Sequence, residues 1–376
     1  MKIAFDAKRL YNNFTGLGNH SRTTLDMLMT YFPDNEYYLY TPKVKMCSAT
    51  EKYYSDSHVT TVLPPNLLNG SIWRSFGMSR NMVHDKIDVY HGLSHEMPTG
   101  LGDIPSVVTI HDVAFKQHMQ MYHWVDRFTY DLKWSYSCKN ASRLIAISEC
   151  TKRDIMKFYN VEEERISVIY QPVQQLYYSP IEKSVALSAV RESLPNIPED
   201  FMLYVGSVNS RKNLLSAVKS IESLPKDIQI PLVIVGGGRE YKEEVERYIE
   251  LKGLNNLFVW QSVKDNELLH ALYASAKVFV YPSLYEGFGL PVVEALLSGC
   301  PVVTSNVSSL PEACGPHSLM ASPTDIGELR DCISIALTDT ERREAMIEKG
   351  REYAIEKFSP KTLASQLISV YEDVLK

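Results

Sequence analysis

The chain has 376 residues, 45% hydrophobic and 22% charged, with a formal net charge of −6. Single domains usually have about 100 to 200 residues, so this length predicts two domains. The acidic balance disfavours nucleic acid as a partner. The sequence begins MKIAFDAKRL, without a secretory signal's apolar run, and has no stretch near the roughly 20 apolar residues of a membrane-spanning helix. We therefore expect a cytoplasmic protein whose only membrane contact would be peripheral.

The six cysteines are scattered, and none forms a C-x-x-C pair. This spacing predicts reduced thiols that pack as small apolar groups, and neither a structural zinc site nor a disulfide framework.

Short β-rich runs alternate with segments of helical period along almost the whole chain. This alternation predicts parallel sheets covered by helices on both faces. The predicted strands are 2–6, 37–41, 59–63, 88–92, 105–112, 142–148 and 166–170 in the first half, and 201–206, 231–237, 257–260, 277–283, 300–305 and 317–321 in the second.

A proline-rich stretch without clear period, QPVQQLYYSPIEKS followed by LPNIPED, separates the two series of strands and predicts the inter-domain connection. The predicted fold is α/β, with two Rossmann-like doubly wound domains facing each other across a cleft and ligands beyond the C-terminal strand ends. We assign 1–175 to the N-terminal domain and 176–357 to the C-terminal domain. The helix at about 358–376 is a candidate to pack back on the first domain.

The first glycine-rich loop, FTGLGNHSRTTL, places Gly16 and Gly18 before a helix expected to open near Asn19 to Ser21. Glycines let the backbone approach a bound group, and a helix N-terminus favours an anion. The loop is not a dinucleotide fingerprint, because Ser21 occupies the third glycine position. A flexible turn without a ligand remains the alternative.

Two loops of the second series carry further signals. In VGSVNSRKNLLSAV, Arg211 and Lys212 stand just before a helix expected to start at about Asn213, which suits a diphosphate; a solvated basic turn is the alternative. In VGGGRE, the three glycines 236–238 permit approach by a ribose or base, but they equally suit a plain strand-to-helix turn.

The segment YEGFGLPVVE carries Glu286 in a loop and Glu294 one turn into a helix. Gly289 can adopt a left-handed conformation, Pro291 suits the first helical turn, and the backbone amides of about 289–292, Leu290 included, could cradle an anion. Two carboxylates so placed could accept hydroxyl hydrogens from two parts of one ligand. Because helix-start glutamates are common, the pair alone is weak, and its sequence context is what makes it specific.

Together these motifs resemble the family 4 retaining glycosyltransferases of the GT-B architecture. The resemblance extends over nearly the whole chain through TGLGNH, VVTIHD, VGSVNSRKN, VGGGRE and YEGFGLPVVEALLSGCPVV, in the family's order and spacing. The phrases WRSFGMSRNMVHDKIDVYHG and VTIHDVAF are most similar to the branch that contains bacterial mannosyltransferases of O-antigen and capsule assembly.

The resemblance implies roles for individual residues. Glu286 would contact the transferred sugar and Glu294 the ribose hydroxyls, while Arg211 and Lys212 would hold the diphosphate. His111, in the His-Asp pair of VTIHDVAF, would lie next to the donor sugar. Gly16 and Gly18 would lie over the diphosphate from the facing domain, and Gly289 and Leu290 belong to the donor-binding set.

The implied chemistry needs no cofactor beyond the nucleotide-sugar co-substrate. The sequence holds no D-x-D, so a carboxylate-held metal has no obvious ligands. Positive side chains and helix ends would stabilise the leaving diphosphate. The resemblance implies front-face attack in which the leaving phosphate oxygen helps to deprotonate the acceptor. His111 is then better assigned to positioning and charge stabilisation than to general base work, although a histidine could do either.

The acceptor is expected on the first domain. Residues 64–84 mix apolar side chains (Ile72, Trp73, Phe76, Met82) with arginines and could contact a membrane surface or a lipid-linked acceptor; an ordinary helix packed on its own sheet is the alternative.

The leading hypothesis is a metal-independent hexosyltransferase that transfers a hexose, with mannose from GDP-mannose as the suggested donor, to a glycan or lipid-linked acceptor of the cell surface. The alternatives are an epimerase-like enzyme that processes sugar nucleotides and a non-catalytic subunit that binds them.

Overall fold

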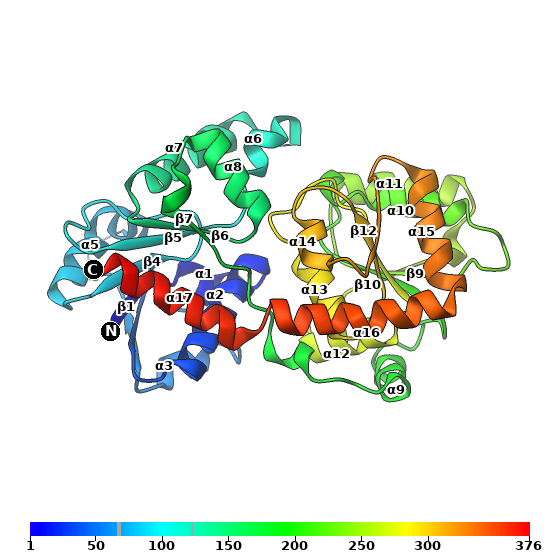
Figure 1. The fold of residues 1–376 in the computed structure, drawn as a ribbon, viewed down its shortest axis with the longest axis horizontal. Coiled ribbons are helices and arrows are strands. Elements are labelled where there is room, and N and C mark those ends of the chain that lie inside the picture. The colour runs from blue at the N-terminus through cyan, green and yellow to red at the C-terminus, as the bar shows by residue number, and fades with distance from the viewer. Residues whose placement is uncertain (66–68, 122) are drawn as a thin grey trace. The chain divides into compact units, whose positions relative to one another are not determined.

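The computed structural model describes residues 1–65, 69–121 and 123–376. The chain divides into two compact units. Unit 1 comprises Met1–Pro172 with Ser359–Lys376, and unit 2 comprises Val173–Phe358. Within unit 1 the C-terminal helix α17 (Pro360–Val374) packs against α2 (Gly16–Tyr31) near the start of the chain (Figure 1).

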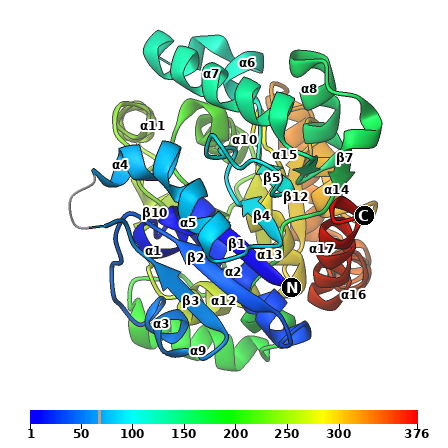
Figure 2. The same cartoon turned by 90° about the vertical axis from the view of Figure 1, so that its left-hand side faces the viewer.

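Unit 1 is built on one parallel sheet with the strand order β3-β2-β1-β4-β5-β6-β7. Figure 2 shows β1 between β2 and β4. The order reverses between β1 and β4, which is the topological switch point of a doubly wound sheet. The strands are β1 (Lys2–Asp6), β2 (Glu36–Tyr40), β3 (Val59–Val62), β4 (Val89–Gly92), β5 (Ser106–Ile110), β6 (Arg143–Ala146) and β7 (Ile166–Val168).

Helices connect these strands, and their ends follow local chemistry. The Ser148 hydroxyl accepts the Thr151 N–H at the start of α8, and left-handed Asn160 ends that helix. The helices are α1 (Lys8–Asn12), α2 (Gly16–Tyr31), α3 (Glu51–Ser55), α4 (Gly70–Ile72), α5 (Met78–His84), α6 (Ala114–Gln117), α7 (Trp124–Asn140), α8 (Glu149–Tyr159) and α17 (Pro360–Val374).

Unit 2 repeats this design with the parallel order β10-β9-β8-β11-β12-β13, so its switch point lies between β8 and β11. Every residue of β8, β9, β11 and β12 is buried, as expected of strands covered on both faces. The strands are β8 (Met202–Val205), β9 (Leu232–Val235), β10 (Phe258–Gln261), β11 (Val278–Tyr281), β12 (Val302–Ser305) and β13 (Leu319–Ala321).

The helices of unit 2 pack in pairs around this sheet. α12 packs on α9, α10 on α15, and α13 on α16. The carboxylates of Asp265, Asp325 and Asp339 cap α12, α15 and α16 by accepting backbone N–H groups of the first turn. The helices are α9 (Lys183–Ser193), α10 (Leu214–Glu222), α11 (Glu240–Leu251), α12 (Asn266–Ser275), α13 (Leu290–Leu297), α14 (Leu310–Cys314), α15 (Ile326–Thr338) and α16 (Thr340–Lys357).

The predicted fold class is therefore confirmed as two Rossmann-like units, each with a doubly wound parallel sheet. All six cysteines are free thiols. None of the helices in the described ranges combines the length and the apolar composition that a membrane-spanning helix needs.

The segment expected to contact the acceptor, 64–84, is partly described, because residues 66–68 lie outside the described residues. Trp73 and Met82 are buried in a core cluster of unit 1, and Arg74 pairs with Asp6. Ile72 and Phe76, in contrast, are exposed. One face of the described part of this segment thus packs on its own sheet, which is the ordinary helical arrangement that the sequence left open.

The loop after β1 corrects one boundary. Helix α2 begins at Gly16, earlier than the predicted opening near Asn19 to Ser21, with extended Thr15 as its N-cap. A Cβ at Gly18 would lie 1.7 Å from the Asn13 carbonyl oxygen, whereas a Cβ at Gly16 would meet no atom within 4 Å. Packing of the loop on the helix therefore requires Gly18 to be glycine, while Gly16 is unconstrained within unit 1.

We predict that Gly18→Ala destabilises the protein by about 1–3 kcal/mol, the usual cost of forcing an extra carbon into a packed region. Gly16→Ala is the matched control and should change the free energy of unfolding by less than about 0.5 kcal/mol. Urea denaturation of both variants measures the difference. Equal stability of the two variants would contradict the packing role of Gly18.

Candidate functional site

The candidate site of unit 2 lies at its topological switch point. The loop after β8 carries Arg211 and Lys212, and the loop after the neighbouring strand β11 carries Glu286. Because parallel strands end at the same edge of a sheet, two loops that are far apart in sequence meet there. The Leu284 N–H donates to the Arg211 carbonyl at 2.8 Å and ties the loops together.

A buried ion cluster joins these loops. The Glu286 side chain is 9% exposed, and its two oxygens bind Arg211 Nη1 at 2.9 Å and Lys212 Nζ at 2.6 Å. The Tyr281 hydroxyl donates to the same carboxylate at 3.2 Å, and the Lys212 ammonium also donates to that hydroxyl. Arg211 further donates to the Tyr285 carbonyl at 2.6 Å. The two cations thus have an internal counter-ion.

The charge state of Glu286 follows from these contacts. Burial alone would raise its pKa, but the charges of Lys212 and Arg211 outweigh burial and lower the pKa to about 2. Glu286 is therefore ionised at any physiological pH, and the cluster of two cations and one carboxylate carries a net positive charge.

Polar contacts of the backbone hold the second loop in place. The Glu286 N–H donates to Ser308 Oγ at 3.0 Å, and the Ser309 hydroxyl donates to the carbonyls of Glu286 and Phe288 at 2.9 and 2.8 Å. In the first loop, the Asn209 side chain accepts the Lys212 N–H at 3.2 Å. These serines and Asn209 were not singled out from the sequence, although polar residues at strand ends are a general signal of such support.

The start of α13 offers fewer backbone N–H groups to an anion than the sequence predicted. Gly289 adopts a φ of 115°, which favours glycine, and caps the helix. Pro291 has no N–H, and the Val292 N–H donates to the Gly289 carbonyl at 2.9 Å. Of the predicted range 289–292, the amides of Gly289 and Leu290 are therefore the ones left for an anion.

Glu294 lies within α13, whereas Glu286 lies in the loop before this helix, and the two carboxylates have different environments. Its carboxylate accepts a hydrogen bond from the Tyr273 hydroxyl at 3.2 Å, and no ion pair reaches it among the described residues. Burial raises the pKa of Glu294 to about 7, although the Tyr273 hydrogen bond opposes the rise. One ten-residue segment therefore holds one permanently ionised carboxylate and one that titrates near neutrality.

The glycines of VGGGRE divide between packing and open space. A Cβ at Gly236 would lie 1.9 Å from the Gly206 carbonyl oxygen, and one at Gly238 would lie 2.1 Å from the Val208 carbonyl oxygen. A Cβ at Gly237 would meet nothing within 4 Å. Two of the three glycines thus serve the close approach of two strand-end loops, which is the structural alternative that the sequence left open.

In unit 1, His111 follows β5 and is buried. Its Nε2 lies 2.8 Å from the Leu93 carbonyl oxygen, and its Nδ1 lies 2.8 Å from the Gln171 side-chain nitrogen. Because a carbonyl only accepts, Nε2 carries the proton and Nδ1 accepts from the amide. Burial lowers the pKa of His111 to about 4 despite the opposing effects of Leu93 and Asp112. His111 is therefore neutral, and both ring nitrogens are engaged.

A second buried histidine packs against His111 in unit 1. His20, near the start of α2, is buried, and its ring centroid lies 4.6 Å from that of His111.

At the switch point of unit 1, Arg74 Nε donates to Asp6 at 2.7 Å and Arg74 Nη1 to Glu96 at 2.7 Å. The sequence reasoning missed this ion cluster, since its members lie far apart in the chain. No group of three or more metal-ligating side chains occurs in residues 1–65, 69–121 and 123–376.

Two family models match the chain, one in each half of the sequence. The model described as Glycosyltransferase Family 4 matches residues 22–174, and the model described as Glycosyl transferases group 1 matches residues 189–353.

Curated relatives agree with the family models. The O-antigen chain mannosyltransferase B of Escherichia coli is 31% identical over 290 residues, which are 76% of this chain and 74% of the relative. The MMP alpha-(1->4)-mannosyltransferase of Mycolicibacterium hassiacum is 30% identical over 235 residues, which cover 62% of this chain and 54% of that protein.

Solved structures share the fold. Anabaena HepE in complex with UDP-glucose superposes with a TM-score of 0.78 at 18% identity, covering 99% of this chain and all of the other. WaaG, a glycosyltransferase involved in lipopolysaccharide biosynthesis, superposes with a TM-score of 0.70 at 18% identity and covers 99% of both chains. At this identity the likeness concerns the fold.

The raised pKa of Glu294 predicts a pH-dependent stability. Between the ordinary carboxyl pKa of 4.5 and about 7, the folded chain keeps a proton that the unfolded chain releases, so stability falls as pH rises through this window. Glu294→Gln cannot ionise, and its stability relative to the wild type should increase from pH 4.5 to pH 7 and then level off. Thermal unfolding of both ligand-free proteins across this range tests the prediction, and a difference that does not change with pH would contradict it.

Proposed function

The chain belongs to the glycosyltransferase family whose models match both of its units, and from this premise we propose that it is a retaining hexosyltransferase of cell-surface polysaccharide synthesis. The proposed donor is a nucleotide sugar, and the proposed acceptor is a glycan or a lipid-linked glycan. The single observation that carries the proposal is the positively charged cluster at the switch point of unit 2, where doubly wound sheets bind their ligands.

Mannose from GDP-mannose is the proposed donor. The support is the set of relatives, since O-antigen chain mannosyltransferases from Escherichia coli and Salmonella typhimurium both match this chain. The structural neighbour HepE is described with UDP and UDP-glucose, so uridine nucleotides are the competing donors.

Arg211 and Lys212 are proposed to stabilise the leaving diphosphate. Glu286 neutralises one of the two charges and fixes both side chains in position, so the remaining charge is preorganised toward the strand ends. The amides of Gly289 and Leu290 at the start of α13 add neutral donors. We propose that these groups make a divalent ion unnecessary.

The two glutamates are proposed to bind different parts of the donor. Glu286, already an ionised acceptor, would contact hydroxyls of the transferred sugar, and Glu294 would bind the ribose hydroxyls. A carboxyl that titrates near pH 7 can accept two hydroxyl hydrogens when ionised but fewer when protonated. Donor affinity should therefore depend on the state of Glu294.

His111 is proposed to act by position. Its pKa of about 4 makes it a weak base at neutral pH, and Nδ1 already accepts a hydrogen bond. This supports a reaction in which a phosphate oxygen of the leaving group, and not this imidazole, receives the proton of the acceptor hydroxyl. Gly16 and Gly18 are proposed to approach the diphosphate, Gly16 being the one with open space for a ligand.

Removal of either partner of the ion cluster tests the assignment. We predict that Lys212→Ala and Glu286→Gln each lower the rate of mannosyl transfer from GDP-mannose by at least about 100-fold, the usual loss when a preorganised electrostatic group is removed. Lys226→Ala, an exposed lysine of unit 2, is the matched control. Circular dichroism establishes that each variant is folded. Near-wild-type turnover of both folded variants would overturn the site assignment.

Nucleotide selectivity tests the proposed donor separately. Thermal unfolding with GDP, UDP, ADP or CMP, in the presence of EDTA, should show a selective shift with GDP, because a ligand at 100 times its dissociation constant stabilises the folded state by about 2.7 kcal/mol. A selective shift with UDP would overturn the mannose proposal while keeping the transferase. A GDP shift that appears only when a divalent ion is added would contradict metal independence.

A further inference from the structure

A cavity lined by basic side chains lies at the edge of the unit 2 sheet opposite to the Glu286 ion cluster. Its lining includes Lys277, just before β11, and Pro301, just before β12, so it lies at the amino ends of the strands. The proposed donor site lies beyond their carboxyl ends. A four-residue strand spans roughly 13 Å, so the two sites are separate.

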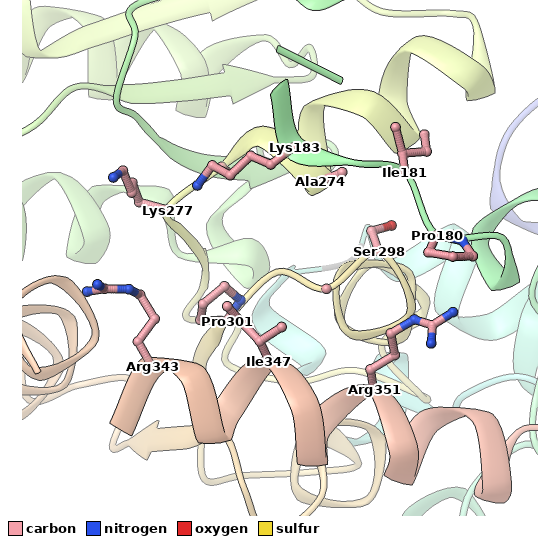
Figure 3. Close-up of a pocket in the computed structure, with 12 residues that line it drawn as sticks. Pro180, Ile181, Lys183, Ala274, Lys277, Ser298, Pro301, Arg343, Ile347 and Arg351 are labelled. Carbon is pink, nitrogen blue, oxygen red and sulfur yellow. The ribbon is translucent and has the colours of Figure 1, made fainter. Parts of the chain in front are cut away.

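The cavity has a volume of about 290 Å³ and carries basic but no acidic side chains in its lining. In Figure 3 the side chains of Lys183, Lys277 and Arg343 extend toward one end of the cavity, and Arg351 lies at the other. These residues come from four separate places in the sequence, the start of α9, the start of β11 and two turns of α16. Because they form no contiguous motif, the sequence alone could not predict this cavity.

Two of these cations have structural partners. Arg351 donates to the carbonyls of Leu297 and Tyr178 at 3.0 and 2.9 Å. Arg343 Nη1 donates to the carbonyls of Ala336 and Leu337 at 3.2 and 2.8 Å, at the end of α15. These bonds fix the guanidinium groups but leave their charge without a carboxylate.

The lysines are the part that packing does not explain. Lys277 has one counter-ion, Asp200, at 3.1 Å, and both side chains are partly solvated, with exposures of 35% and 54%. Lys183 has no ion pair among the described residues. Its pKa is lowered by burial and by the neighbouring charges of Lys277 and Arg343, which outweigh the opposing effect of Asp200, so these two cations repel Lys183. The nearby Cys300 thiol, whose pKa burial raises to about 12, stays neutral and does not compensate them.

The rest of the lining suits an organic ligand. Ile181, Pro301 and Ile347 give the cavity apolar walls, and the Ser298 hydroxyl, which donates to the Glu294 carbonyl at 2.7 Å, keeps lone pairs for an incoming donor. An inorganic cation would meet only positive side chains here. A bound anion would relieve their repulsion, and a doubly charged one would do so best.

We propose that this cavity binds the phosphate group of a small phosphorylated ligand, with Lys183, Lys277 and Arg343 around the phosphate and the apolar walls against the remainder. This site goes beyond the proposed transfer reaction and does not depend on which sugar nucleotide is the donor. The phosphate could belong to a soluble metabolite or to a lipid headgroup, because both present the same charged group.

Calorimetric titration of the full chain with inorganic phosphate and with glycerol 3-phosphate tests the proposal. Both probes should bind, and Lys183→Gln and Lys277→Gln should each weaken the binding about tenfold or more, as expected for the loss of one charge-assisted hydrogen bond. Lys349→Gln, an exposed lysine of the same helix as Arg343, is the matched control and should leave binding unchanged. Lys212→Ala, which alters the donor site, should also retain it.

Two results would overturn the proposal. One is phosphate binding that Lys212→Ala abolishes and the two cavity variants retain, since it would place the anion in the donor site. The other is the absence of any binding heat with either probe at millimolar concentration.

Sedimentation with vesicles of phosphatidylcholine and phosphatidylglycerol identifies the source of the phosphate group. Loss of vesicle binding in Lys183→Gln, but not in Lys349→Gln, assigns the phosphate to a lipid headgroup, and an absence of vesicle binding assigns it to a soluble ligand.

Discussion

The ionised carboxylate of Glu286, buried with two cations at the ends of β8 and β11, is the interaction on which the functional geometry of unit 2 depends. An ionised carboxylate away from water is stable only when it is well paired. Pairing the carboxylate with both Arg211 and Lys212 fixes the two loops to one another. Because two positive charges face one negative charge, the cluster keeps a net positive charge. The remaining positive charge lies where a doubly wound sheet opens to its ligands, so the stability of the loop and the proposed binding of a diphosphate would have the same origin.

The two glutamates of the segment 285–294 show how the environment divides roles between identical side chains. Cations hold the pKa of Glu286 at about 2, whereas burial without a cation raises that of Glu294 to about 7. The first is a permanent part of the electrostatic framework. The second can change its charge when a ligand arrives, and hydrogen bonds donated by ligand hydroxyls would favour its ionised form.

Much of the fold was predictable because strands and the turns after them are determined by residues that are close in sequence, namely apolar runs and the glycines that follow them. The strands of both sheets lie where β-rich runs indicated them, and the central strands β8, β9, β11 and β12 are buried on both faces. Contacts between residues far apart in the sequence were not predictable in the same way. The charge of Lys212 suggested an external anion, but its partner in the ligand-free chain is a carboxylate 74 residues away. Likewise, sequence alone could not separate Gly18, which packing requires, from Gly16, which it does not.

The proton of the acceptor hydroxyl needs a base, and neither His111 nor Glu286 is suited to that role. Neutral His111 has a pKa of about 4 and already uses both ring nitrogens, and Glu286, with a pKa of about 2, is bound to two cations. A group with so low a pKa accepts a proton poorly at neutral pH. A donor diphosphate held by Arg211 and Lys212 would bring its own oxygen to the reacting centre as the bond to the sugar breaks. The cluster proposed to stabilise the leaving group would therefore also position the proposed base.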